Sequence, residues 1–371
     1  MKFKFFSLSI FFLFSLLICG CLASAENSEE KNSSTKTSDP VEEILKSMTL
    51  EEKVGQMMLV GVHGTTINDD MKNILNQYHY GGIIFYDRNM ENKAQVKKLA
   101  DDLQTVANQK LPLFIALDEE GGRVMRMKHD MPNVPSQQEI ANSGDVSNAY
   151  SYAQLLAQNL RNIGVNINFA PVADVSNDTR SFSNDPKITA DFVSSAAKGY
   201  DAENFFYCLK HFPGIGKSKI DPHKNISDID DDFDTLAIED LPPFTKVISE
   251  QDNSKFMIMS GHLRYTALDD KNPASISPVI VTEILRNKLG FTGVIITDDL
   301  QMGATSDYRE NIGVKAIQAG ADIALVCHEY DTQKKVYQGI LEAVQRGEIS
   351  EERINESVRR ILKMKLNIPT N

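Results

Sequence analysis

Short apolar runs recur along this chain with room for a helix between them, and this alternation constrains the fold more than any other feature. The runs are nearly continuous in Val, Ile, Leu, Phe and Met, as in parallel strands that are buried on both faces. The eight runs are Gln56–Val62, Gly81–Tyr86, Leu113–Asp118, Val165–Pro171, Phe205–Pro213, Phe256–His262, Gly293–Asp299 and Ile323–Cys327. Amphipathic stretches lie between most of them, for example Asp69–Tyr78, Asn92–Ala107, Ser151–Asn162, Thr282–Leu289 and Asn311–Ala319. Strand and helix in alternation predict a parallel α/β architecture.

The number of strand–helix units indicates which α/β architecture this is. Eight units over about 320 residues favour a (β/α)8 TIM-type barrel over a doubly wound sheet. No G-x-G-x-x-G follows an early run, and no Walker-type loop is present. Ser350–Leu366 has the pattern of a basic amphipathic helix that would close the domain. Because no second boundary is visible, we expect residues 41–371 to form a single barrel domain.

The N-terminus has the pattern of an export signal. Two lysines precede the apolar run Phe5–Ile18, which is too short to span a bilayer comfortably and has the shape of a signal-peptide core. The run leads into Cys19-Gly20-Cys21, which resembles the bacterial lipobox. By that resemblance residues 1–20 are a signal peptide and Cys21 is lipidated, which anchors the protein to the extracytoplasmic face of the cell membrane. An ordinary cleaved signal is the alternative. Residues 21–40 are small and polar without periodicity, as in a flexible tether.

Composition excludes several classes of protein. With 39 basic and 51 acidic residues the formal net charge is −12, which argues against a nucleic-acid-binding protein. Four cysteines are too few for a disulfide scaffold. After removal of the signal peptide and lipidation of Cys21, Cys208 and Cys327 remain, and both lie in apolar runs. We interpret them as small buried core residues rather than as a disulfide.

Ionisable residues follow five of the predicted strands at or just past their carboxyl ends. They are Asp118, Asp174, Lys210 with His211, His262, and Asp298 with Asp299. In a parallel barrel all of these strand ends lie on one face, which is where such barrels place their active sites. One charged residue in this position would be a solubility feature, but five together predict a convergent polar site.

The available residue types narrow the chemistry of that site. Familiar zinc spacings and the G-x-S-x-G elbow are absent from the sequence, although His211, His223 and Asp298 leave a metallohydrolase as a minor alternative. In Asp221-Pro222-His223 a carboxylate could orient an imidazole that transfers protons. A carboxylate nucleophile with a separate proton donor is the logic of retaining glycoside hydrolysis, which usually uses two carboxylic acids.

A series of motifs makes the chain recognisable. In order they are Met48-Thr-Leu-Glu-Glu-Lys-Val-Gly-Gln-Met57, Gly81-Gly-Ile-Ile-Phe85, Asp118-Glu-Glu-Gly-Gly-Arg-Val-Met-Arg126, Phe169-Ala-Pro-Val-Ala-Asp174, Arg180-Ser-Phe182, Lys210-His-Phe-Pro-Gly214, Asp221-Pro-His223, Met259-Ser-Gly-His262 and Leu289-Gly-Phe-Thr-Gly-Val-Ile-Ile-Thr-Asp-Asp-Leu300. The chain resembles single-domain β-N-acetylhexosaminidases of glycoside hydrolase family 3 over nearly all of the part expected to fold. The number and order of these motifs make a chance resemblance very improbable.

The resemblance implies a role for each matching residue. Asp298 matches the family's nucleophile, which forms a glycosyl-enzyme intermediate, and His223 matches the acid/base with Asp221 as its partner. The residues that match those holding the sugar's hydroxyl and N-acetyl groups are Asp118, Arg126, Arg180, Lys210 and His211. Asp174 and His262 fit a supporting shell, with a buried hydrogen-bonded structural role as the alternative for both. The resemblance implies no cofactor and no metal.

Two departures from the family pattern concern the acid/base segment. Pro222 stands where the family usually has a small residue such as Ser, and Pro213-Gly-Ile-Gly216 replaces the common Pro-Gly-His-Gly. Proline fixes φ, so Pro222 could stiffen a loop that is expected to move with His223. The timing of proton donation by His223 is therefore in question. Within the family, an Asp-x-His dyad in this position accompanies N-acetylglucosaminidases. The extra C-terminal domain of longer members has no counterpart here, so we expect the barrel alone to form the site.

The sequence therefore predicts a lipid-anchored, monomeric, retaining exo-β-N-acetylglucosaminidase that acts on peptidoglycan or muropeptide fragments. The peptidoglycan source follows from the family and the anchor and not from any residue. The alternatives are an N-acetylglucosaminide phosphorylase, a chitooligosaccharide hydrolase or other β-glycosidase of the family, and a non-catalytic sugar-binding lipoprotein. The acidic run Asp228–Asp234 lacks the central glycine and spacing of a calcium loop, so we expect a solvated loop there.

Overall fold

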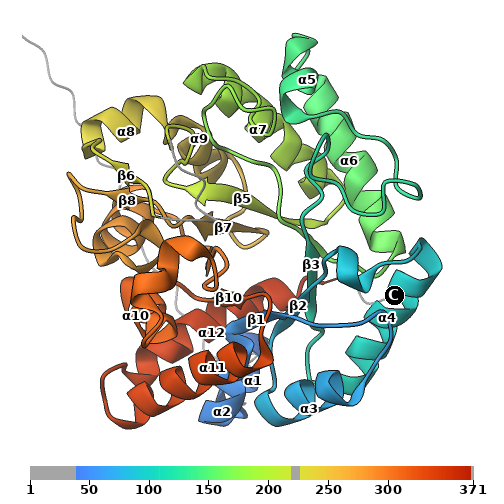
Figure 1. Ribbon diagram of the computed structural model, residues 1–371, viewed down its shortest axis with the longest axis vertical. Coiled ribbons are helices and arrows are strands. Elements are labelled where there is room, and N and C mark those ends of the chain that lie inside the picture. Colours follow the sequence, from blue (N-terminus) through green and yellow to red (C-terminus); the bar gives the residue numbers. More distant parts are fainter. Residues whose placement is uncertain (1–38, 108, 219–225, 369–371) are drawn as a thin grey trace, which may run out of the picture. The chain divides into compact units, whose positions relative to one another are not determined.

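The computed structural model describes residues 39–107, 109–218 and 226–368, and eight parallel strands lie at the centre of this part of the chain (Figure 1). These strands are β1 (Met58–Gly61), β2 (Gly82–Ile84), β3 (Phe114–Leu117), β4 (Ile167–Asn168), β5 (Phe206–Phe212), β7 (Phe256–Ser260), β9 (Val294–Thr297) and β10 (Ala324–Val326). Each lies within one of the eight apolar runs. All but a few of their residues are apolar, and all are buried, because the strands are covered on both faces.

The strands form a nearly closed barrel, which confirms the predicted TIM-type fold. Every neighbouring pair is parallel, in the order β10-β1-β2-β3-β4-β5-β7-β9, so the first strand of the chain pairs with the last. A single bridge between Ile296 and Ile323 joins β9 to the segment that leads into β10. The backbones of β1 and β10 approach so closely that a Cβ on Gly61 would lie 1.9 Å from the carbonyl oxygen of Cys327. Gly61 is therefore required where the barrel closes.

Helices surround the strands in Figure 1. The α-helices are α1 (Pro40–Lys46), α2 (Leu50–Gln56), α3 (Asp69–Tyr78), α4 (Lys93–Ala107), α5 (Gln137–Asn142), α6 (Ser147–Asn162), α7 (Pro186–Ala202), α8 (Phe233–Glu239), α9 (Pro242–Glu250), α10 (Ile312–Ala319), α11 (Tyr330–Gln345) and α12 (Glu351–Lys365). Short turns of 3₁₀-helix are η1 (Asp87–Asn89), η2 (Ala274–Ile276) and η4 (Gly303–Tyr308), whereas η3 (Val279–Lys288) is π-helical. No helix of the described residues is both long enough and apolar enough to cross a membrane.

Local sequence sets where several helices begin. Thr49 forms a capping box with Glu52 at the start of α2, and Asp185 caps α7 immediately before a proline at its first position. The predicted range Asp69–Tyr78 coincides with α3. The helix predicted from Ser151 begins at Ser147, because the first turn of α6 is polar on its exposed side and carries no periodic signal.

The acidic run Asp228–Asp234 differs from the predicted solvated loop. Asp228 and Ile229 form the strand β6, which pairs with β8 (Arg264–Tyr265), and Asp228 makes a two-pronged ion pair with Arg264 at 2.8 Å. Asp232 caps α8 through the backbone N–H of Thr235. The run therefore begins in a small sheet and ends in a helix, and the prediction of a loop is wrong at both ends.

The core fills the barrel and the space between strands and helices. Cys208 and Cys327 are both buried and free, which confirms that they do not form a disulfide. At the amino ends of the strands the ammonium of Lys365, from α12, lies 2.7 Å from Oε1 of Gln56 and 5.0 Å from the centre of the Phe114 ring. Burial lowers the pKa of Lys365 to about 7. Packed side chains therefore fill the barrel at the amino ends of its strands.

Candidate active site

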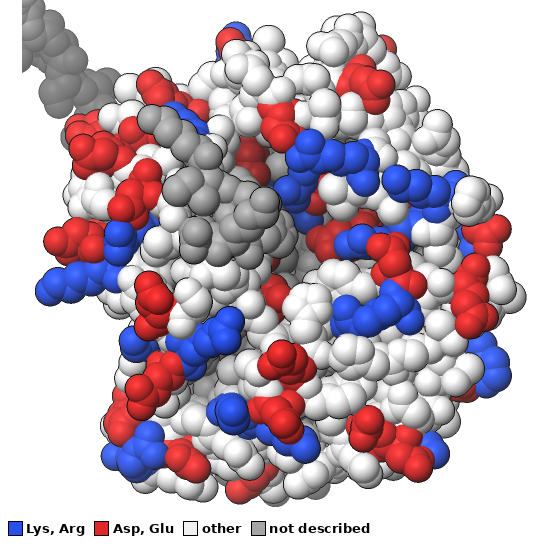
Figure 2. Space-filling view, viewed as in Figure 1, with Lys and Arg blue, Asp and Glu red and all other residues white. Residues whose placement is uncertain are grey.

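A pocket of about 900 Å³ lies at the carboxyl ends of the strands. Figure 2 shows this face hollowed near its centre, with basic and acidic side chains gathered around the hollow. Predicted site residues that line it are Asp118, Arg126, Arg180, Lys210, His211, His262 and Asp298. They come from the ends of β3, β5, β7 and β9 and from the loops that follow β3 and β4. The barrel brings together residues that span about 180 positions of the chain.

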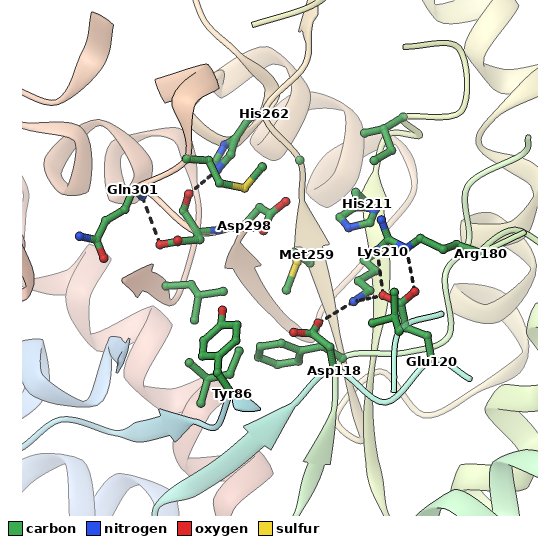
Figure 3. Close-up of a pocket in the computed structure, with 18 of the residues that line it drawn as sticks. Tyr86, Asp118, Glu120, Arg180, Lys210, His211, Met259, His262, Asp298 and Gln301 are labelled. Carbon is green, nitrogen blue, oxygen red and sulfur yellow. Dashed lines mark hydrogen bonds and ion pairs between the residues drawn. The ribbon is translucent and has the colours of Figure 1, made fainter. Parts of the chain in front are cut away.

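A chain of alternating charges forms one wall of the pocket (Figure 3). The ammonium of Lys210 lies 2.7 Å from a carboxylate oxygen of Asp118 and 2.6 Å from one of Glu120. Arg180 donates two hydrogen bonds to Glu120, at 2.7 and 2.8 Å. Burial lowers the pKa of Lys210, but Asp118 and Glu120 raise it more, so the pKa lies above its usual value. This wall presents fixed carboxylate oxygens and fixed N–H donors to a ligand.

Arg126 extends the charged wall toward the pocket rim. Its guanidinium lies 3.4 Å from Asp118 and 3.2 Å from Asp87, and 5.4 Å from the centre of the Tyr86 ring. The backbone N–H of Arg126 donates to a carboxylate oxygen of buried Glu119 at 2.8 Å. Glu119 therefore fixes the turn that carries Arg126 without facing the pocket itself.

His211 is held by Asp174, which the sequence placed in a supporting shell. Nδ1 of His211 donates to Asp174 at 2.8 Å, and the backbone N–H groups of His211 and Ile215 donate to the other carboxylate oxygen at 3.1 and 2.9 Å. Burial raises the pKa of Asp174, but His211 and these hydrogen bonds lower it more, so this carboxyl stays ionised. With Nδ1 occupied, only Nε2 of His211 is left for a ligand.

The two consecutive aspartates after β9 have different surroundings. Asp299 Oδ1 accepts the backbone N–H groups of Cys327 and Gln301, and its Oδ2 lies 3.3 Å from His328. Asp298 accepts only the N–H of Asp299, through Oδ1 at 2.8 Å, and its Oδ2 has no partner among the described residues. Asp299 is therefore committed to the loop structure, whereas Asp298 keeps one oxygen that no described residue occupies.

The electrostatic surroundings of Asp298 keep it ionised. Burial raises the pKa of Asp298. The neighbouring His211 and His262 side chains, the backbone N–H of Asp299 and the Lys210 ammonium lower it more, so this pKa lies below its usual value. His262 donates from Nε2 to the Asp299 carbonyl at 2.9 Å, and its Nδ1 is 2.7 Å from the hydroxyl of Ser275. With both ring nitrogens occupied, His262 supports the strand end and is not available as a proton donor.

Three predicted residues lie outside the described part of the chain. They are Asp221 and His223, the predicted acid/base pair, and Cys21, the predicted lipidation site. Pro222 lies there too. Along the sequence, the described residues on either side of this segment are Ser218, which lines the pocket, and Ile226.

Several residues of the pocket were not singled out from the sequence. Glu120 joins Lys210 to Arg180, yet only its place inside the quoted Asp118–Arg126 motif could have indicated it. In the view of Figure 3, Met259 lies between Asp298 and Lys210, and Tyr86 lies below them; both line the pocket. Tyr86 ends one apolar run and Met259 lies within another, so the sequence could not separate them from core residues.

One group of carboxylates has the geometry of a cation site, but a side chain of the protein already fills it. Asp231, Glu239 and Asp240 lie close together, and the ammonium of Lys217 is 2.5, 2.7 and 2.8 Å from them. These acids therefore hold Lys217. Of the residues that we considered as metal ligands, His211 keeps Nε2 and Asp298 keeps Oδ2 without a partner among the described residues, and His223 lies outside them.

Comparison with known proteins identifies the family. The sequence profile of the glycosyl hydrolase family 3 N-terminal domain matches residues 49–364, which is nearly the whole of the described chain. The chain belongs to glycosyl hydrolase family 3.

Two curated relatives and one solved structure illustrate the similarity. Family 3 relatives include beta-hexosaminidase A of Pseudoalteromonas piscicida, 31% identical over 82% of this chain and 56% of that protein. The beta-hexosaminidase of Xylella fastidiosa strain M23 is 33% identical over 73% of this chain and 83% of its own. A glycoside hydrolase family 3 β-N-acetylglucosaminidase from Paenibacillus sp. str. FPU-7 superposes with a TM-score of 0.83 and 35% identity, over 86% of this chain and 62% of that one. The chain thus spans less than two thirds of the Pseudoalteromonas and Paenibacillus proteins.

Proposed function

We propose that this family 3 protein is a retaining exo-β-N-acetylglucosaminidase. The observation that carries the proposal is Asp298, which is ionised, has one oxygen without a partner among the described residues, and stands opposite the charged wall of Asp118, Lys210 and Glu120. The names of the relatives, beta-hexosaminidase and β-N-acetylglucosaminidase, support the same activity.

The proposed reaction has two displacement steps. In the first, Oδ2 of Asp298 attacks the anomeric carbon, the bond from that carbon to the aglycone oxygen breaks, and the leaving oxygen takes a proton from His223. In the second, a water molecule gives its proton to His223 and attacks the same carbon, which breaks the bond to Asp298 and releases the sugar. Asp221 would orient His223. These roles of Asp221 and His223 rest on the sequence resemblance alone.

The charged wall is suited to holding the terminal sugar. Asp118 can accept hydrogen bonds from two hydroxyl groups, while Arg126, Arg180, Lys210 and His211 can donate to hydroxyl and N-acetyl oxygens. Because Lys210 and Arg180 are already fixed by Glu120, little conformational freedom is lost when the sugar binds. Asp174 and His262 would keep His211 and the end of β9 in place.

We further propose that the substrate is peptidoglycan or its muropeptide fragments, and that the enzyme is anchored through a lipid on Cys21. The export-signal pattern of residues 1–20 and the lipobox-like Cys19-Gly20-Cys21 support the anchor. An enzyme on the outer face of a cell membrane would meet cell-wall glycan directly.

The first experiment compares an aryl β-N-acetylglucosaminide with the matching β-glucoside, with and without phosphate, using Asp298→Asn as the control. We expect hydrolysis of the N-acetyl sugar alone, and a loss of at least about 10³-fold in kcat for Asp298→Asn with an unchanged thermal unfolding temperature. Release of sugar 1-phosphate, faster with added phosphate, would identify a phosphorylase instead. If neither sugar is cleaved, the proposed activity is wrong, and the outcome favours a non-catalytic sugar-binding lipoprotein or an acid/base loop that Pro222 disables.

A further inference from the structure

Glu119 and Arg126, beside the active-site pocket, each keep a buried polar atom that has no hydrogen-bond partner in the described part of the chain. Glu119 is fully buried, and its Oε2 accepts the backbone N–H of Arg126 at 2.8 Å. The two atoms without a partner are Oε1 of Glu119 and Nε of the Arg126 side chain. A buried polar atom without a partner costs free energy, so an arrangement that pairs these two atoms would be favoured.

The backbone around Glu119 is fixed, so only side chains can change this arrangement. The side-chain amide of Asn168, from β4, accepts the backbone N–H of Glu119 at 2.9 Å and donates to its carbonyl at 2.8 Å. Between Glu119 and Arg126 the chain makes a tight turn, in which the N–H of Glu120 donates to the carbonyl of Val124 at 3.0 Å. The long side chain of Arg126 is therefore the part of this unit that can change position.

The ion pairs that hold the Arg126 guanidinium at the pocket are long. It lies 3.4 Å from Asp118 and 3.2 Å from Asp87, and the Asp87 side chain is 73% exposed. Exposed ion pairs are weak because water and salt screen them, whereas a pair with a buried carboxylate is screened much less. A charge on Glu119 would therefore compete with Asp118 and Asp87 for this guanidinium.

The surroundings of Glu119 determine when it carries a charge. The titratable and charged groups that face it come from the loop after β3, from η1 and from α7, and they are Asp118, Arg126, Asp87 and Tyr200. Burial raises the pKa of Glu119 to about 7; the N–H and guanidinium of Arg126 lower it, and the two aspartates raise it. Tyr200 stays neutral, because burial raises its pKa as well. Glu119 therefore changes its charge near neutral pH.

We propose that Glu119 is a proton-sensing positioning residue for the bound sugar. In its neutral form Glu119 leaves the Arg126 guanidinium at the pocket beside Asp118. In its ionised form it draws the guanidinium toward Oε1 and away from the sugar. The inference rests on the proposed function, because it takes Arg126 as a donor to the terminal N-acetylglucosamine. The affinity for this sugar should therefore fall as the pH rises through 7.

The test compares the full chain with its Glu119→Gln variant, which keeps an acceptor for the Arg126 N–H but cannot ionise. KM for an aryl β-N-acetylglucosaminide is measured at pH 5.5 and at pH 8.5, and the ratio of the two values is compared between the proteins. We expect this ratio to be about tenfold larger in wild type, since ionised Glu119 removes a charged donor from the sugar. An equal ratio in both proteins would overturn the inference.

A second pair of variants shows whether Glu119 acts through the guanidinium. In an Arg126→Ala background, the further change Glu119→Gln should leave the ratio of KM values as it is, because the group that Glu119 moves is absent. If Glu119→Gln lowers the ratio equally with and without the guanidinium, Glu119 acts in another way and the inference is wrong.

A binding measurement separates this inference from the proposed function. N-acetylglucosamine that holds Arg126 at the pocket favours neutral Glu119, so its binding at pH 7 should take up protons in wild type and fewer in Glu119→Gln. Titration calorimetry in two buffers of different ionisation enthalpy measures this uptake. If wild-type protein cleaves no aryl glycoside but shows this difference, the proposed activity is wrong and the positioning role stands. If it cleaves the glycoside and both proteins take up protons equally, the positioning role alone is wrong.

Discussion

Glu119 and Glu120 are consecutive residues whose side chains lie on opposite sides of the loop after β3. Burial raises the pKa of Glu119 to about 7, and Oε1 of this side chain has no partner in the described structure. Burial also raises the pKa of Glu120, but Lys210 and Arg180 lower it to about 2. At any pH between these two pKa values, Glu119 is mostly neutral and Glu120 is mostly ionised. The two glutamates differ because Lys210 and Arg180 pair with Glu120 and not with Glu119.

Glu119 should make the stability of the protein depend on pH. Its folded-state pKa lies above the ordinary value of 4.5, so its contribution is complete below about pH 4.5 and is lost as the pH rises through 7. Glu119→Gln keeps an acceptor for the N–H of Arg126 but cannot ionise. We expect the variant to gain about 2–3 kcal/mol over wild type between pH 5 and pH 9. Urea unfolding at both pH values measures this, and an identical pH dependence of the two proteins would contradict it.

Sequence reasoning reached only some of the site residues. Asp118, Lys210 and Asp298 could be predicted because each follows directly on an apolar run, and parallel strands bring such positions to one face. Arg126 and Arg180 lie in loops without periodicity, so only the family resemblance indicated them. Glu120 could not be distinguished from Glu119 in advance, because the direction of a side chain in an irregular loop depends on partners that are distant in sequence.

At the scale of elements, one buried carboxylate helps to fix α12 to the barrel. Asp322 lies just before β10 and is fully buried. It bonds to Arg286 of η3, to Arg360 at 3.0 Å and to the hydroxyl of Ser357 at 2.6 Å, and the last two belong to α12. Burial raises the pKa of Asp322, but the arginines lower it more.

Asp322→Asn should therefore destabilise the fold, since it leaves buried guanidinium groups without their counter-charge. We expect a loss of about 3–5 kcal/mol in the free energy of unfolding near pH 7. The contribution of a lowered carboxyl pKa is present above the unfolded value and disappears as the pH falls through the folded one. The difference between variant and wild type should accordingly shrink in acid, and a difference of under 1 kcal/mol at pH 7 would contradict the role of Asp322. Denaturant unfolding at pH 7 and pH 4 measures both.

Elements were predicted best where the sequence pattern is clear. The helix α3 coincides with an amphipathic range, and all eight barrel strands lie within nearly continuous apolar runs. The two-residue strands β6 and β8 are too short for any pattern, and they form through pairing between distant segments. The π-helical turn of η3 was predicted as an ordinary helix from Thr282, because apolar spacing does not distinguish the two.

At the scale of the whole molecule, the proposed anchor can be tested without disturbing the barrel. Cys21→Ser should move the protein from the membrane fraction to the soluble fraction and abolish incorporation of labelled fatty acid. Cys19→Ser is the matched control, because Cys19 lies within the predicted signal peptide and should leave anchoring intact. Membrane association that survives Cys21→Ser, or that is lost equally in Cys19→Ser, would refute the lipobox.

The pairing of the first strand with the last has a kinetic consequence. During synthesis β1 emerges early, yet its hydrogen-bonding edge toward β10 stays open until nearly the whole barrel has been made. Contacts between such distant segments form slowly, since a large loop must close before they gain any energy. An open apolar strand edge is also a site of aggregation. We therefore expect β1 to be a site of aggregation in the nascent chain for the interval between the synthesis of the two strands.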